Sequence, residues 1–242
     1  MREGVVLVVA RPRDDGVAEL THCAGTREVA VVEPRDLSRP GWRYVANAPE
    51  ELVIIAGERR VRAFELAAVV MRLVHIGETD LPHIVPEDRG YVAAESEAFL
   101  RAALAWLTCP VFNRPTATSL NGPYWRAEQW RAAALSAGIP ASPLVRHLDP
   151  GSPQTVDGVS PDVDASVVVI GDQCVGSDDS RLRGYARDLA SAAGVSLLSV
   201  SFKRDGERWC FLDASTQPPI THGVAAVLLR TLGKGRALRL VA

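Results

Sequence analysis

The stretch Cys109-Pro-Val-Phe-Asn113-Arg-Pro115 decides the fold, because a short apolar run passes directly into turn residues there. The apolar part predicts a strand over Cys109–Asn113, and a region rich in Pro, Thr, Ser, Asn and Gly continues to Pro123. A helix is predicted next over Tyr124–Ala137, with Gly138 where a C-terminal cap is expected. This strand, turn and helix form one unit of an α/β layer.

Similar units precede this stretch. Apolar runs rich in β-branched residues predict strands at Val5–Ala10, Val29–Val32 and Leu52–Ala56, and in the second half of Phe64–Leu73. A stripe of 3.6-residue period predicts a helix over Ala94–Leu107. We therefore expect an N-terminal open α/β sheet.

The chain after Ala137 changes character twice. From His147 to Ala165 the chain is rich in turn-forming Asp, Pro, Gly and Ser and has few apolar residues, which predicts a linker or a long surface loop. Beyond it we expect a C-terminal antiparallel sheet with helices, made of Ser166–Ile170, Gln173–Val175, Asp179–Ala193 (helix), Leu197–Phe202, Trp209–Leu212, Thr221–Leu232 (helix) and a last short strand at Ala237–Val241. The predicted domains are residues 1–123, a bridging helix and connector at 124–164, and residues 165–242.

Composition excludes several classes of function. The 242 residues carry a formal net charge of −2, so no basic footprint for nucleic acid exists. The four cysteines have no Cys-x-x-Cys spacing, which supports neither a zinc site nor a disulfide framework. No stretch approaches the roughly 20 apolar residues of a membrane span, and the apolar start is shorter than a signal sequence requires. We expect a cytoplasmic protein without nucleic-acid or membrane partners.

The ordered motifs resemble the ATP-grasp superfamily, in the branch of ribosomal-protein glutamate ligases and graspetide (microviridin-type) peptide ligases. Cys109–Pro115 resembles the family's strand ending in Asn-x-Pro, and Val69-Val-Met-Arg72 its strand ending in arginine. Ala165-Ser-Val-Val-Val-Ile-Gly-Asp172 looks like its strand and turn, and Trp209-Cys-Phe-Leu-Asp213-Ala-Ser215 like its metal-binding segment. The resemblance implies a pre-ATP-grasp-like N-terminal domain and a truncated ATP-grasp-like C-terminal one.

The sequence departs from this family in the residues that bind ATP. The family places its nucleotide lobe, with lysines that hold phosphate, between the two parts quoted above. Here the connector of Arg146 to Ala165 has no lysine, and the family's helix lysine, near Trp125 to Glu128, is absent. Lys203 and Lys234 are the only lysines in the sequence, and neither lies where the family binds phosphate.

The family's magnesium ligands depart in the same way. By the resemblance, its Asp, Glu and Asn ligands fall on Ser201, Asp213 and Ser215, so Asp213 alone keeps a carboxylate and is at most a vestigial metal ligand. We therefore expect no cofactor, with ATP and Mg²⁺ only if a partner completes the site.

Four residues are candidates for binding a substrate: Arg72, Asn113, Arg114 and Asp213. The two arginines lie at strand ends, at the edge where open α/β sheets bind ligands, and arginine suits bidentate carboxylate recognition. His147, His222 and Asp213 could form a metal or acid/base cluster, but their spacing favours surface histidines. Trp125 and Trp130 are five positions apart, which predicts rings on different helix faces.

Two hypotheses follow. The first is a truncated, non-catalytic ATP-grasp relative that binds a peptide, a small carboxylate or a full-length ATP-grasp ligase, as an accessory in peptide or natural-product modification. The second is an ATP-dependent carboxylate–amine ligase that a partner chain completes. A homodimer is expected, because a lost lobe should uncover apolar surface.

Overall fold

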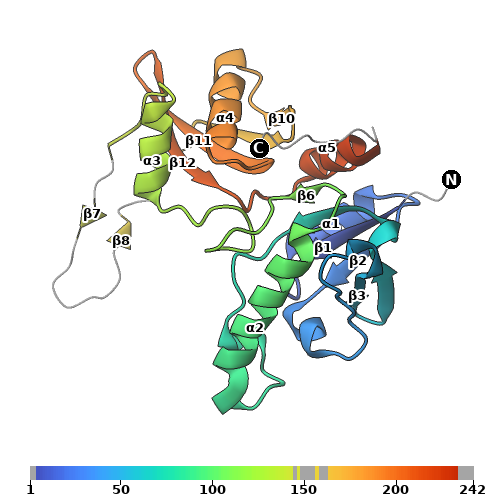
Figure 1. Cartoon of the computed structure of the whole chain (residues 1–242). Helices are drawn as coiled ribbons and strands as arrows, with labels where there is room; N and C mark the ends of the chain where they lie inside the picture. Colours follow the sequence, from blue (N-terminus) through green and yellow to red (C-terminus); the bar gives the residue numbers. More distant parts are fainter. Residues whose placement is uncertain (1–3, 144–145, 148–155, 158–162, 234–242) are drawn as a thin grey trace.

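Two four-stranded sheets form the centre of the computed structural model, which describes residues 4–143, 146–147, 156–157 and 163–233. The N-terminal sheet is parallel, and the C-terminal sheet is antiparallel (Figure 1). The predicted α/β class, with an open N-terminal sheet and a C-terminal antiparallel sheet with helices, is confirmed. Among the described residues, no helix has the length and apolar content that a membrane crossing requires.

The N-terminal sheet is covered on both faces. Its strand order is β2 (Val29–Val32), β1 (Val5–Val9), β5 (Leu66–Met71) and β6 (Val111–Phe112). One face packs against α2 (Pro86–Ala105), and the other packs against α1 (Asp15–Cys23). Every residue of β1 is therefore buried, and a strand buried on both faces reads as one continuous apolar run.

The C-terminal sheet is covered by two helices on one face. Its order is β10 (Gln173–Gly176), β9 (Ala165–Ile170), β11 (Leu197–Asp205) and β12 (Arg208–Ser215). The helices α3 (Ala127–Ser136) and α4 (Ser180–Ala192) pack on it through a core that includes Trp130, Leu189 and Phe202. Asp179 caps α4 by accepting a hydrogen bond from the N–H of Arg181.

The last described helix, α5 (His222–Gly233), packs against both sheets (Figure 1). Val224 and Leu228 share one apolar core with Val8 of the first sheet and Ile170 of the second. Its predicted cap is confirmed, because Thr221 Oγ1 accepts a hydrogen bond from the N–H of Val224. Residues 165–242 are thus tied to residues 1–123 by a shared core, while the domain boundaries themselves stay predictions.

No helix was predicted from the sequence where α1 lies, and the predicted start of α2 is wrong. Asp14 caps α1 by accepting from the N–H of Gly16 at 2.9 Å, but α1 buries only Gly16 and Leu20, so its apolar stripe is weak. The helix α2 begins at Pro86 instead of Ala94. Proline suits a first helical position, where no backbone N–H is needed.

A hairpin and several 3₁₀ turns complete the N-terminal part. The strands β3 (Val53–Ala56) and β4 (Arg59–Arg62) pair across Gly57, which has a φ of 58°. The sequence did not predict β4, since Val61 is its one buried residue. The 3₁₀ turns are Pro34–Ser38, Pro49–Glu51, Ala63–Glu65 and Glu78–Asp80.

The connector between α3 and β9 contains, in its described part, one short antiparallel pair. This pair is β7 (Arg146–His147) with β8 (Val156–Asp157), and it lies away from both sheets (Figure 1). The predicted turn sequence at 149–153 lies outside the described residues, as do Lys234 and the strand predicted at 237–241, and Asp157 alone is described in the turn sequence at 157–161.

The prediction for the two tryptophans is wrong. Trp125 and Trp130 meet edge to face, with ring centroids 4.8 Å apart. The helix α3 begins at Ala127, so Trp125 precedes it and helical spacing does not apply to the pair. Both rings pack against the core beneath α3 and α4.

Candidate functional site

Polar side chains line the face of the C-terminal sheet opposite α3 and α4. Ser201 and Ser199 of β11 lie opposite Asp213 and Ser215 of β12. Because side chains alternate along a strand and Val200 is buried beneath α4, these four point to the other face. The structure therefore brings the trio of Ser201, Asp213 and Ser215 together. The pairing of β11 with β12 shifts register between Ser201 and Phe202, next to Asp213, whose side chain is exposed.

This group of side chains does not fit a magnesium ion. Mg²⁺ prefers near-octahedral sets of hard oxygen ligands, commonly carboxylates. Ser215 Oγ already accepts a hydrogen bond from the N–H of Gln217 at 3.1 Å, and Ser199 Oγ donates to Ser215 O at 3.3 Å. Asp213 supplies the one carboxylate of this four-residue group.

Arg72 lies at the junction of the two sheets. Its Nη1 donates to the carbonyl of Pro218 at 2.7 Å, and its Nε faces both carboxylate oxygens of Asp14 at 3.3 Å. In return, Gln217 Nε2 donates to the carbonyl of Arg72 at 2.6 Å. Arg72 thus holds the segment after β12 against the carboxyl end of β5, and its predicted role in substrate binding stays a prediction.

Asn113 is buried in the same junction, with 1% of its surface exposed. Its Oδ1 accepts from the N–H groups of Ser196 and Leu197, and its Nδ2 donates to the carbonyls of Leu197 and Thr216. Asn121 donates to the same carbonyl of Thr216 at 3.0 Å. The Asn-x-Pro position therefore joins the end of β6 to the C-terminal sheet.

Arg114 points away from that junction. Its Nη1 donates to the carbonyl of Leu104 at 2.8 Å and its Nη2 to that of Leu107 at 2.7 Å. The final carbonyls of a helix have no partner within the helix, so Arg114 satisfies groups at the end of α2. Arg72 and Asn113 come together through the segment after β12, whereas Arg114 lies apart from them.

A further ion pair lies near the carboxyl edge of the parallel sheet. Arg11 donates to both carboxylate oxygens of Asp80, at 2.7 and 3.0 Å. Burial alone would raise the pKa of Asp80, but the hydrogen bonds from Arg11 and the N–H of Gly77, with the charges of Arg11 and His75, hold this pKa below its usual value. This pair braces the loops that follow β1 and β5.

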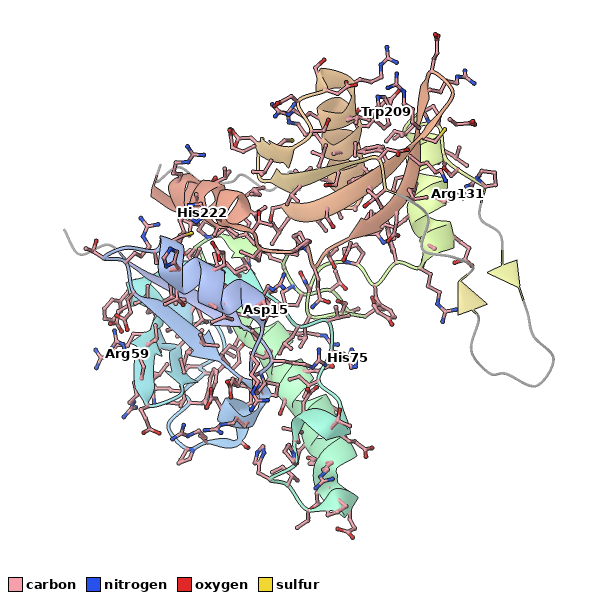
Figure 2. All side chains as sticks on the ribbon, turned by 180° about the vertical axis from the view of Figure 1, so that it is seen from behind. Asp15, Arg59, His75, Arg131, Trp209 and His222 are labelled. Atoms are coloured by element: carbon pink, nitrogen blue, oxygen red, sulfur yellow. The ribbon has the colours of Figure 1, made fainter. Side chains whose placement is uncertain are left out.

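A groove that sequence reasoning missed runs beside β2. Within the described part of the chain, β2 pairs with β1 alone, so its outer edge has no strand partner, and β3 lies near it without pairing. A cavity of about 360 Å³ lies along this edge, and one of about 440 Å³ adjoins it at the β3–β4 hairpin. Arg59 lines both cavities and lies on the side of the molecule away from the C-terminal sheet (Figure 2).

Arg60 and Arg62 give the hairpin end of this groove an excess of positive charge, whereas both acidic and basic residues line the cavity along β2. Arg59 donates to Glu28 at 2.7 Å and to Glu65 at 3.0 Å, so its charge is balanced. No ion pair within 4.0 Å joins the guanidinium of Arg60 or Arg62 to a carboxylate among the residues described, although Glu65 accepts a hydrogen bond from the backbone N–H of Arg62 at 2.8 Å. The Arg62 guanidinium lies 5.8 Å from the ring centroid of Phe64, which is 73% exposed. The run Arg59-Arg-Val-Arg62 was visible in the sequence, but a charged run alone is typical of any solvated surface.

Several solved structures have a similar fold, among them a macrocyclase and an ATP-grasp ligase. The macrocyclase MdnC from Microcystis aeruginosa MRC, bound to precursor peptide MdnA, has a TM-score of 0.71 at 12% identity, covering 96% of this chain and 100% of its own. The ligase PsnB, in complex with a minimal precursor, Mg and ADP, has a TM-score of 0.67 at 15% identity, covering 95% of this chain and 97% of its own.

A RimK domain protein from Sphaerobacter thermophilus DSM 20745 has a TM-score of 0.53 at 15% identity, covering 94% of this chain and 99% of its own. No family model matches the chain, and no curated protein matches it. The ATP-grasp-like fold that the ordered motifs predict is therefore shown.

Proposed function

We propose that this ATP-grasp-fold chain is a non-catalytic protein that binds a carboxylate-bearing peptide, as an accessory in peptide modification. The observation that carries the proposal is the groove beside β2. An open strand edge offers main-chain hydrogen bonds to an extended peptide. Arg60 and Arg62 offer charge to its carboxylates, and Phe64 offers apolar contact. The neighbours MdnC and PsnB, solved with precursor peptides, support a peptide as the class of partner.

The chemistry of the sheet face supports a non-catalytic role. ATP-grasp ligation requires groups that hold triphosphate charge and divalent cations. The sequence has lysines only at Lys203 and Lys234, and the group around Asp213 is poor in carboxylates. We therefore propose that ATP and Mg²⁺ are not cofactors of the isolated chain.

One observation favours the alternative, a ligase completed by a partner chain. Asp213 is exposed on a sheet face opposite Ser201, so a second chain has access to it. A full-length ATP-grasp ligase or a second copy of this chain would be such a partner. ATP-dependent ligation that appears only after a partner chain is added would establish this alternative.

Peptide binding can be tested with a labelled probe of defined chemistry. The probe is a short, end-blocked peptide that alternates valine and glutamate, and its counterpart replaces each glutamate with lysine. We expect fluorescence anisotropy to show saturable binding of the glutamate peptide, weakened about tenfold or more by the double variant Arg60→Ala/Arg62→Ala. Arg181→Ala, an exposed arginine on α4, is the matched control. Equal binding of both peptides, or an unaffected double variant, would contradict the proposal.

A further inference from the structure

Three side chains from distant parts of the sequence meet where α1 packs against α5. Glu19 and Cys23 are four residues apart on α1, so they share one face of that helix. His222 is the first residue of α5. In Figure 2 the helix that carries Asp15 and the helix that begins at His222 lie side by side, and Leu20 and Val224 join them in one core.

The three side chains present their donor atoms to one another. His222 Nδ1 lies 3.2 Å from Glu19 Oε1 and 3.3 Å from Cys23 Sγ. Cys23 Sγ lies 3.7 Å from the same Glu19 oxygen. The cluster therefore offers one sulfur, one nitrogen and one oxygen within a small triangle.

This triangle has the dimensions of one face of a tetrahedral zinc site. Zinc binds sulfur at about 2.3 Å and nitrogen or carboxylate oxygen at about 2.0–2.2 Å, so donors at tetrahedral angles lie roughly 3.3–3.6 Å apart. A zinc ion could therefore be bound with little movement of the helices. The donor types agree, since thiolate and imidazole suit zinc, whereas magnesium and calcium take oxygen ligands.

The same geometry argues against a nucleophilic Cys–His–Glu triad. In such a triad one imidazole nitrogen faces the nucleophile, and the other nitrogen is oriented by the carboxylate. Here Cys23 and Glu19 both approach Nδ1 of His222. One nitrogen cannot receive the proton of the thiol while it donates to the carboxylate, so the arrangement suits chelation.

We propose that Glu19, Cys23 and His222 bind a zinc ion that fastens α1 to α5. The side chain of His222 is 73% exposed, and the ring of His22 lies 6.2 Å away between centroids, near enough to supply a fourth donor after a rotation of its side chain. The ion would reinforce a contact that Arg27 already makes by donating to the carbonyl of Leu229 at 2.9 Å. Since α1 covers the first sheet and α5 packs on both, zinc would stabilise the arrangement of the two sheets.

Sequence spacing could not reveal this cluster. Cys23 and His222 are 199 residues apart, and the chain has no paired-cysteine motif. The cluster considered from sequence joined His222 to His147 and Asp213. His222 instead faces α1, and the side chain of His147 lies outside the described residues.

Cobalt substitution tests the site directly in the full chain. After chelator treatment, titration with Co²⁺ should produce a thiolate-to-cobalt charge-transfer band and the visible bands of four-coordinate cobalt, both abolished by added Zn²⁺. Cys23→Ser should remove the charge-transfer band, and His222→Gln should weaken cobalt binding about tenfold or more. Cys174→Ser and His83→Gln are the matched controls and should change neither. A six-coordinate spectrum without a thiolate band, or a band that survives Cys23→Ser, would overturn the proposal.

A second measurement separates loss of the metal from loss of the fold. Zn²⁺ should raise the Tm of the native chain and of both controls, because it binds the folded state. Glu19→Gln and Cys23→Ser should unfold cooperatively but show little or no rise with Zn²⁺. An equal rise in these two variants, or no rise in the native chain, would contradict the zinc site while leaving the peptide-binding proposal untouched.

Discussion

Arg72 donates a hydrogen bond to the carbonyl oxygen of Pro218, 146 residues later in the chain, and so fastens the carboxyl end of the first sheet to the segment that leaves the second. Its Nε also faces Asp14, the residue that caps α1. Side-chain exposure is 11% for Arg72 and 16% for Asp14, so this pair is largely removed from water. One guanidinium therefore links a strand end, a helix cap and the second sheet.

Replacing Arg72 should destabilise the whole molecule. Arg72→Ala leaves Asp14 without its cationic partner and the carbonyl of Pro218 without its donor, which we expect to cost about 2–4 kcal/mol. Arg72→Lys should recover only part of this stability, because a lysine ammonium keeps the positive charge but cannot reproduce the several donors of the guanidinium. Urea unfolding monitored by tryptophan fluorescence measures both. A change below about 0.5 kcal/mol, the size expected for a surface control such as Arg181→Ala, would show that the junction does not depend on Arg72.

Asn113 should be equally sensitive, through hydrogen bonding alone. In Asn113→Asp the side chain keeps its shape and its acceptor for the N–H groups of Ser196 and Leu197. It loses the amide donor to the carbonyls of Leu197 and Thr216. We expect a loss of about 2–4 kcal/mol at neutral pH, since a buried carboxylate would oppose both carbonyls. The loss should shrink in acid, where the carboxyl can donate one hydrogen bond. An unfolding free energy that is unchanged at pH 7 would contradict this reading of the junction.

The pair of Arg11 and Asp80 should make stability depend on acid pH. The pKa of Asp80 lies below its usual value in the folded chain, so the folded state binds this proton less readily than the unfolded state does. The stabilisation is therefore present above about pH 4 and is lost as pH falls through the folded pKa. Asp80→Asn should cost about 1–2 kcal/mol at pH 7 and progressively less toward pH 3. A cost that does not change over this pH range would rule out the ionised pair as its source.

Cys109 should resist modification in the folded chain. Burial raises the pKa of its thiol to about 11, while the charge of Arg114 lowers it by a smaller amount. Because the thiolate is the reactive form, alkylation by iodoacetamide at pH 8 should be at least tenfold slower at Cys109 in the native chain than after unfolding in guanidinium. Mass spectrometry of digested samples measures the two rates. Equal rates in both states would show that Cys109 is not shielded.

The sequence predicted those parts of the molecule in which local patterns and tertiary burial agree. The apolar run of β1 is buried on both faces, and α4 has both a capping Asp179 and an amphipathic stripe, so both were visible. The family resemblance placed Ser201 and Asp213 on two adjacent strands, and the structure pairs them directly.

Other features depend on contacts that no local pattern encodes. The helix α1 buries only Gly16 and Leu20, and Val61 is the one buried residue of β4, so neither element has a strong apolar pattern. The groove beside β2 arises because a strand edge is left open, and strand order cannot be read from composition. The triangle of Glu19, Cys23 and His222 exists only once α5 has returned to the first sheet.

One titration experiment tests the central claim most directly: that the chain keeps the ATP-grasp scaffold and binds an acidic peptide without ATP. Isothermal titration of the full chain with Mg²⁺ and ATP, followed by the valine–glutamate peptide, measures both ligands in one sample. We predict no saturable heat from ATP and saturable heat from the peptide, lost in Arg60→Ala/Arg62→Ala. Micromolar ATP binding that disappears in Asp213→Ala, with no heat from the peptide, would contradict the account.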